Sequence, residues 1–242
     1  MTKQWLAMVA AVCCVVAGTA ALSGCGGGGG IPAAIPVPAA GGPLSADFFP
    51  LNAGDRHTYR VTSSSGGQSF LRIRTGTQRS VDGVNVIPLE ELDDQNRVRR
   101  VQFVRVANGA FEIIGEDRLD PATGAVLQSI RFAPPQSYPF NSTFDQTFTV
   151  TSENAETTTE VTLLPFETMT VHAGTFPNAA RLRIRTTSGT GGQITEVSRW
   201  FAAGVGEIRS VLSSGGSVVS AELIFASVGG RTYGDVDATA AY

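Results

Sequence analysis

The sequence predicts an all-β domain, built mainly as an antiparallel sheet that curves into a cradle or open barrel. From Leu44 onward, apolar and polar residues alternate with a period of two. Turn signals separate these segments at roughly the 8 to 12 residue spacing of antiparallel proteins. After the first 25 residues, no stretch of ten or more carries an apolar stripe at helical spacing. A β-sandwich is the alternative, because alternation does not show whether a sheet curls or stacks.

Residues 1–24 have the pattern of a secretory signal peptide. Lys3 and the amino terminus form a short positive region, and an unbroken run of apolar and small residues extends from Trp5 to Leu22. An uncleaved transmembrane helix is the alternative, because a run of this length could just span a bilayer. The short positive flank favours the signal peptide.

Leu22, Ser23, Gly24 and Cys25 follow this run directly and resemble the lipobox of bacterial lipoproteins. The resemblance implies that the chain is cut before Cys25 and that Cys25 carries a diacylglycerol thioether. It also implies a further fatty chain, such as palmitate, on the new amino terminus. One acyl chain binds a protein to a membrane only marginally, whereas several chains anchor the protein stably. We therefore expect a permanent membrane tether.

Residues 25–43 are expected to contain the lipidated cysteine and a linker. Five glycines, Gly26–Gly30, precede a segment rich in Pro and Ala, and neither composition builds a core. As a flexible coil the linker would reach roughly 25 Å. Gly26 stands where the resemblance to enterobacterial lipoproteins would place an aspartate for inner-membrane retention. We therefore expect an outer-membrane lipoprotein with its domain in the periplasm.

Charge and cysteine content exclude several classes of function. Only 16% of the 242 residues are charged, and the net charge is −3, so no basic field favours nucleic acid. Lys3 is the one lysine, so cleavage leaves 17 arginines against 21 acids. With Cys13 and Cys14 removed and Cys25 acylated, no thiol remains for disulfides, metal ligation or nucleophilic catalysis.

Residues 44–230 hold the predicted strands, and residues 231–242 form a tail. The strand segments are rich in Val, Ile, Thr and Phe: 57–62, 70–75, 98–106, 126–132, 147–151, 157–164, 181–187 and 218–228. The turn segments between them are rich in Gly, Asn, Asp and Ser: 65–67, 81–83, 93–96, 108–109, 120–124, 189–192 and 213–216.

Arginines mark one face of two predicted strands. Arg181, Arg183 and Arg185 alternate with apolar residues, so one strand face should be solvated. Such a face could bind anions or lipopolysaccharide, or it could be an ordinary surface with acidic partners on neighbouring strands, which we favour. The pentapeptide Leu-Arg-Ile-Arg-Thr occurs at both 71–75 and 182–186. This repetition suggests two similar halves, or it is a chance match in a strand-rich chain.

Several landmarks together resemble a family of uncharacterised β-rich secreted bacterial proteins, many of them lipoproteins. They comprise residues 49–55 running into Tyr59, Val81–Val84, Val171–Phe176 and Trp200–Gly206. The chain departs from the pattern at His57, where an aromatic residue is common, and at Glu207. The resemblance implies a curved antiparallel sheet and supplies no activity.

The glycines of these landmarks are interpreted structurally. Gly174, Gly204 and Gly206 are expected at turns or bulges, with Phe176, Trp200 and Phe201 filling the core beside them. A nucleotide-binding loop is the alternative, but the third glycine and the strand-to-helix context of that motif are missing.

No catalytic, cofactor or metal motif stands out. His57 and His172 are the two candidate bases, and no nucleophile elbow accompanies them in the mature chain. The acid clusters 90–91, 93–94 and 116–117 with Asp120 lack the spacing of a calcium loop, and we expect them to be solvated at strand ends and turns. We therefore expect neither an enzyme nor a cofactor or metal.

Two functions of different class remain. The first is a binding or carrier module that holds an apolar or amphipathic ligand on the concave face of the sheet. The second is an envelope scaffold that docks a protein partner through a sheet face or edge strand. A carrier requires a concave apolar pocket of several hundred Å³, whereas a scaffold requires a filled core and an exposed patch.

Overall fold

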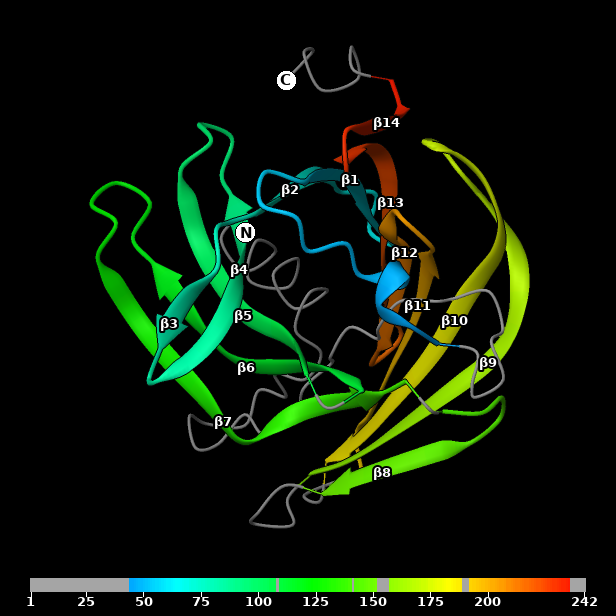
Figure 1. The fold of residues 1–242 in the computed structure, drawn as a ribbon. Coiled ribbons are helices and arrows are strands. Elements are labelled where there is room, and N and C mark those ends of the chain that lie inside the picture. The colour runs from blue at the N-terminus through cyan, green and yellow to red at the C-terminus, as the bar shows by residue number, and fades with distance from the viewer. Residues whose placement is uncertain (1–43, 108, 141, 152–156, 189–191, 236–242) are drawn as a thin grey trace.

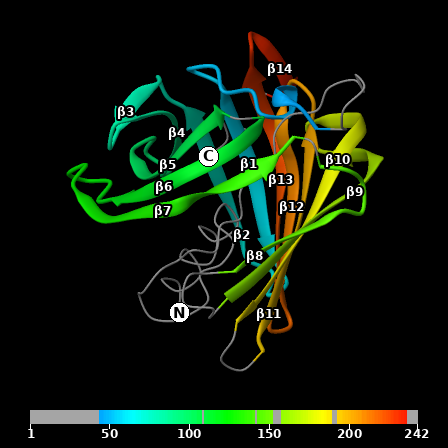
Figure 2. The same cartoon turned by 60° about the horizontal axis from the view of Figure 1, so that its bottom comes forward.

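In the computed structural model, the described residues are 44–107, 109–140, 142–151, 157–188 and 192–235. They form one curved antiparallel sheet that opens on one side as a cradle (Figures 1 and 2). The predicted all-β class is confirmed, and the sheet is single and open rather than two stacked sheets of a sandwich. The signal peptide, Cys25 and the tether lie outside the described residues. No helix within the described residues is long and apolar enough to cross a membrane.

The chain folds as two meanders that meet at a central strand pair. The first meander contains β1 (Arg56–Ser63), β2 (Gln68–Thr75), β3 (Arg79–Val81), β4 (Val84–Leu92), β5 (Val98–Ala107), β6 (Ala110–Leu119) and β7 (Val126–Pro139). The second contains β8 (Thr147–Thr151), β9 (Thr157–Val171), β10 (Gly174–Ser188), β11 (Ile194–Ala202), β12 (Gly206–Ser214) and β13 (Ser217–Val228). β1 pairs with β13, and the sheet runs from β7 at one end to β8 at the other.

The predicted strands match eight of the observed ones, and the structure adds six more. The additional strands are β3, β4, β6, β11, β12 and β14 (Arg231–Gly234). β14 pairs with β13, so the sheet continues past residue 230, where the sequence placed the start of a tail. The two Leu-Arg-Ile-Arg-Thr segments lie on β2 and β10, and these strands do not hold corresponding places in the two meanders.

The main core fills the concave side of the cradle, and a segment at the start of the domain completes it. Residues Ala46–Phe48 form a short 3-10 helix, η1, which Ser45 caps through its side chain. Phe48 and Phe49 are buried. The Phe49 ring lies 4.7 Å from Phe111 and 5.1 Å from Phe201, so one side chain joins the two meanders across the cradle.

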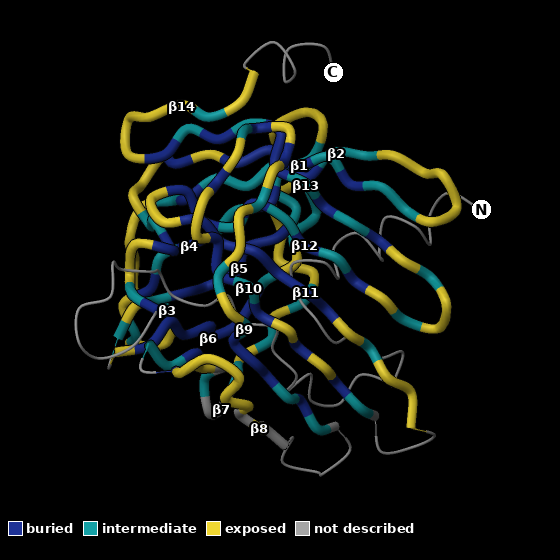
Figure 3. Tube along the Cα trace, turned by 90° about the vertical axis from the view of Figure 1, so that its right-hand side faces the viewer, coloured by how far each residue is buried: buried dark blue, intermediate teal, exposed yellow. Residues whose placement is uncertain are grey.

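A smaller apolar cluster covers the other face of the first meander. It contains Val86, Val101, Phe103 and Ile114. Phe103 belongs to this cluster and its neighbour Val104 to the main core, as expected for adjacent strand residues that point to opposite faces. β5 and β6 are therefore buried on both faces. Figure 3 shows buried positions along the strands and exposed positions at most hairpin ends.

A candidate ligand-binding cleft

An open cleft of about 570 Å³ lies beside the β3–β4 hairpin. Its apolar lining comes from Phe49, Leu51, Val84, Ile87, Val106 and Ala107, and its polar lining from Gln78, Asn85 and Arg105, with Gly83 at the hairpin turn. Its size falls within the range of small-molecule sites in proteins. Val106 is 41% exposed, which leaves a large apolar side chain uncovered in the cleft wall.

Four separate segments build this cleft, and a tight turn fixes one of them. Asp82 and Gly83 both have positive φ, at 50° and 79°, as a two-residue β-hairpin turn requires. The turn holds Val84 and Asn85 at the start of β4, opposite the end of β5. Phe49 and Leu51 come from the segment that completes the core, so the cleft opens directly from it.

The polar groups of the cleft carry one charge, and that charge is paired. Arg105 Nε lies 2.5 Å from Glu112 Oε2 on the neighbouring strand. The side chains of Gln78 and Asn85 make no hydrogen bond to any residue that the structure describes. Both residues are exposed. The cleft therefore combines an apolar wall with uncharged amide groups.

Two of the glycine landmarks, Gly204 and Gly206, lie where β11 turns into β12, and none of the three is among the residues that line the cleft. Gly204 and Gly206 have φ of 73° and 97°, in the region that favours glycine. A Cβ on Gly206 would lie 3.4 Å from His57 Nε2. Gly174 begins β10. Phe176, Trp200 and Phe201 are buried in the main core.

His57, one of the two candidate bases, is a buried residue of the central pair. Its Nε2 lies 2.6 Å from the backbone carbonyl oxygen of Val205, which can only accept, so the ring donates from Nε2. Burial lowers the pKa of His57, while Val205, Asp55 and Glu207 act in the opposite direction. His172, the other candidate, is exposed in the β9–β10 turn.

Glu207, the second departure from the family pattern, neutralises a fully buried arginine. Arg199 has no exposed surface, and its guanidinium donates two hydrogen bonds to the Glu207 carboxylate, at 3.0 and 2.5 Å. The backbone carbonyl of Glu207 accepts a bond from Tyr59 Oη at 3.0 Å. Because a lone buried charge is costly, Glu207 is a structural partner of Arg199.

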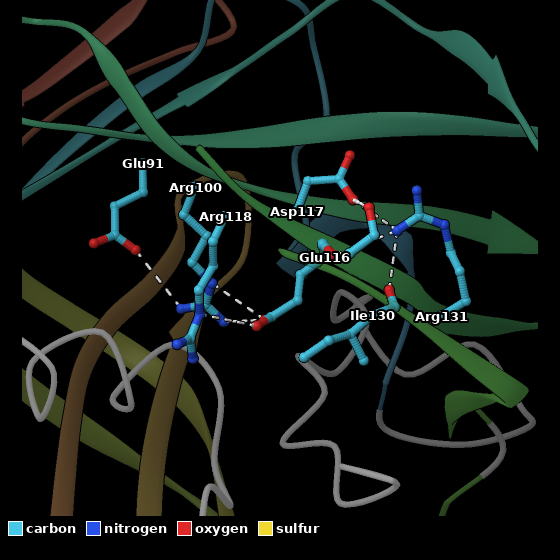
Figure 4. A network of polar contacts seen from close by, with 8 residues as sticks. Glu91, Arg100, Glu116, Asp117, Arg118, Ile130 and Arg131 are labelled. Carbon is cyan, nitrogen blue, oxygen red and sulfur yellow. Dashed lines mark hydrogen bonds and ion pairs between the residues drawn. The ribbon is translucent and has the colours of Figure 1, made fainter. Parts of the chain in front are cut away.

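A second buried ion network corrects the expectation that the acid clusters are solvated. Glu91 and Glu116 lie within β4 and β6 and are only 5% and 3% exposed. Arg100 donates from Nε to Glu116 at 3.1 Å and lies 3.7 Å from Glu91, as Figure 4 shows. Burial raises the pKa of Glu91, against the effect of Arg99. Asp94 is exposed, and Asp93 and Asp120 are partly exposed beside the turns that follow β4 and β6.

On the opposite face of β6, Asp117 belongs to a more exposed network. Arg131 contacts Asp117 at 2.8 Å and Asp82 at 2.9 Å, and its guanidinium carbon lies 5.0 Å from the centre of the Phe103 ring. Arg131 also donates to the backbone carbonyl of Ile130 (Figure 4). The contact with Asp82 joins the β3–β4 turn, which forms one wall of the cleft, to β7.

The arginine row of β10 lies on a solvated face, as the alternation predicts. Arg183 and Arg185 are exposed, while Leu182 and Ile184 are buried. Arg185 lies 3.9 Å from Glu160, and Arg181 lies 3.9 Å from Glu167, both on β9. The acidic partners make this an ordinary charged surface rather than a one-signed anion site.

Within the described ranges, no three His, Cys, Asp or Glu residues converge as a metal site would require. Neither the described contacts of His57 nor those of His172 include a serine hydroxyl.

Comparison with known proteins gives distant structural neighbours. No family model and no curated protein matches the chain. A "putative lipoprotein" from Parabacteroides distasonis is similar at 14% sequence identity and a TM-score of 0.41, over 73% of this chain and 96% of that one. A "putative exported protein with YmcC-like fold" from Bacteroides fragilis has the same identity and TM-score, over 76% of this chain and 98% of that one.

Proposed function

We propose that this chain is a membrane-anchored bacterial lipoprotein whose β domain binds an apolar or amphipathic ligand in the cleft beside the β3–β4 hairpin. The observation that carries the binding function is the cleft itself, about 570 Å³ in volume, with an uncovered valine in its wall. Apolar surface left open in a concave site is the usual mark of ligand binding. The proposal assigns no catalytic step and no cofactor.

The anchoring part of the proposal rests on the sequence from Leu22 to Cys25. A lipid on Cys25 and a linker of residues 26–43 would hold the domain close to the membrane. The absence of an aspartate at Gly26 supports the outer membrane, with the domain in the periplasm. Leu44, the first described residue, is buried in the core, so the linker joins the domain five residues before Phe49 of the cleft.

A dye-binding experiment with one matched pair of variants tests the binding function. The non-lipidated Cys25→Ser protein is titrated with N-phenyl-naphthylamine, a neutral apolar dye that fluoresces when it leaves water. We expect saturable binding that Val106→Asp weakens by roughly tenfold, because a charge replaces apolar contact area. Val218→Asp is the control, since Val218 is equally exposed, at 40%, but lies in the β12–β13 hairpin.

Lipid extraction provides a second measurement on the same proteins. Mass spectrometry of extracts from the protein purified without detergent should detect a bound lipid that the Val106→Asp form lacks. Absence of both dye binding and co-purifying lipid would remove the binding function.

A scaffold function is the second candidate, and the free edge of β7 favours it. β7 is one end of the sheet, and Val126 and Leu127 at its start are 56% and 70% exposed. Such an edge can accept a strand from a partner. This function predicts that Leu127→Lys abolishes a pull-down of envelope partners, whereas Val106→Asp leaves it unchanged.

A further inference from the structure

The charge of the cleft is the starting point. Among the residues that line it, Arg105 is the one charged residue, and Glu112 faces it across the β5–β6 pair at 2.5 Å. The Glu112 side chain is 10% exposed and the Arg105 side chain 31%, so the pair is partly shielded from solvent. The cleft wall is therefore electrically balanced.

The charged residues next to the lining are also engaged elsewhere. Asp82, which precedes Gly83, contacts Arg131 at 2.9 Å. Arg79, which follows Gln78, places its guanidinium carbon 5.3 Å from the centre of the Phe103 ring, in the smaller apolar cluster. The described contacts of Asp82 and Arg79 therefore lie outside the cleft lining.

The uncharged polar groups have the opposite character. Gln78 and Asn85 each offer an amide donor and an amide acceptor, and neither is used within the described residues. A hydroxyl, ester or amide can bond to both types of group. A carboxylate only accepts, and it would lose water without gaining a counter-charge.

We infer that the cleft selects an amphipathic ligand with an uncharged polar head group, such as an acylglycerol or a long-chain alcohol, over a fatty acid anion. The inference rests on the proposed binding function, because it specifies the ligand of the same cleft. The apolar wall of Leu51, Val84 and Val106 would take the acyl chain, and Gln78 and Asn85 would take the head group.

Three ligands that share one acyl chain length test this selectivity. Monolaurin, lauryl alcohol and lauric acid compete with the bound dye at a pH where the acid is ionised. We expect the two neutral ligands to bind about two- to tenfold more tightly than laurate, the range of one hydrogen bond gained or lost. Equal or tighter binding of laurate would overturn the inference. Failure of all three to displace the dye would overturn the binding function instead.

Removing the counter-charge of Arg105 gives the second test. Glu112→Gln keeps the size of the side chain but frees the Arg105 charge, so laurate should gain about threefold or more while monolaurin stays unchanged. Glu160→Gln, which frees Arg185 on β10, is the matched control and should alter neither affinity. Circular dichroism confirms that each variant is folded. An unchanged preference in a folded Glu112→Gln protein would overturn the inference, and so would the same gain in Glu160→Gln.

Discussion

His57 shows how one residue links the pH of the surroundings to the stability of the central strand pair. Its buried ring is needed in the neutral form, and burial lowers its pKa below the usual 6.5. At pH values between the lowered pKa of His57 in the folded protein and 6.5, the unfolded chain binds more protons than the folded one. The neutral His57 ring therefore makes its full contribution to the free energy of unfolding above pH 6.5, and this contribution is lost as the pH falls below 6.5.

Urea denaturation at a series of pH values from about 7.5 to about 5.5 checks this prediction. The free energy of unfolding should fall with decreasing pH in the native sequence and less steeply in His57→Gln. His172→Gln is the control variant, because His172 is exposed in the β9–β10 turn and does not belong to the central strand pair. Glu91, whose pKa is raised, acts with the opposite sign, so the comparison between variants isolates His57. Equal slopes in all three proteins would contradict the prediction.

For single residues, the sequence identified unusual positions but not the groups that they contact. His57 and Glu207 could be recognised as unusual, but not the carbonyl of Val205 or the buried Arg199 that they contact. Solvation was the wrong expectation for Glu91 and Glu116, because a pair of adjacent acids looks the same in sequence whether arginines neutralise it or water does. The cleft residues Asn85 and Val106 carried no signal of their own.

Among the elements, β6 combines a bulge with a position that only glycine fits. The strand register shifts between Ile113 and Gly115 in the pairing with both neighbouring strands. A Cβ there would overlap the backbone carbonyl of Ile130 on β7. Unlike the turn glycines, Gly115 is limited by space rather than by its φ.

Gly115→Ala should therefore destabilise the protein by about 1–3 kcal/mol, because β6 and β7 would have to move apart. Gly67→Ala serves as the comparison: its nearest neighbour is the Ser63 hydroxyl, at 3.2 Å, in an exposed turn, and its effect should stay within about 0.5 kcal/mol. Thermal unfolding followed by circular dichroism measures both. Equal melting temperatures for the two variants would mean that β7 can move away from the added methyl group with no loss of stability, which would contradict the prediction.

Strands with one wet face could be predicted, and strands with other patterns could not. β10 alternates clearly, and its arginines identified it. β6 was missed because the smaller apolar cluster buries its second face, which replaces alternation by a continuous buried run. β4 contains Pro88, and β3 has three residues, too few for a period to be read.

For the protein as a whole, the proposed lipid anchor on Cys25 would determine where the cleft operates. If Cys25 carries the lipid, Cys25→Ser should move the protein from the membrane fraction to the soluble fraction of the envelope and leave its melting temperature unchanged. Cell fractionation with metabolic labelling by a fatty acid measures this. A Cys25→Ser protein that still fractionates with the membrane would contradict lipid anchoring at this residue.

The order of the strands in the sheet could not be predicted from the sequence. Periodicity shows which residues face inward, but not that β1 lies between β2 and β13, or that Phe49 spans the cradle. The cleft depends on that order, since its lining comes from four segments that only the folded sheet brings together. The alternation of apolar and polar residues therefore predicted the all-β class and the strands with one buried and one solvated face. The cleft could be located only from the order of the strands in the sheet.

The pairing of β1 with β13 also sets the timing of folding. Arg56 meets Ser227, so the middle of the sheet is made by residues from opposite ends of the domain. Contacts this remote in the chain form slowly, because the intervening loop has to close first. A nascent polypeptide that ends before residue 217 lacks β13. Its two meanders are therefore not yet joined through the β1–β13 pair. The centre of the sheet is thus completed only after β13 has been synthesised.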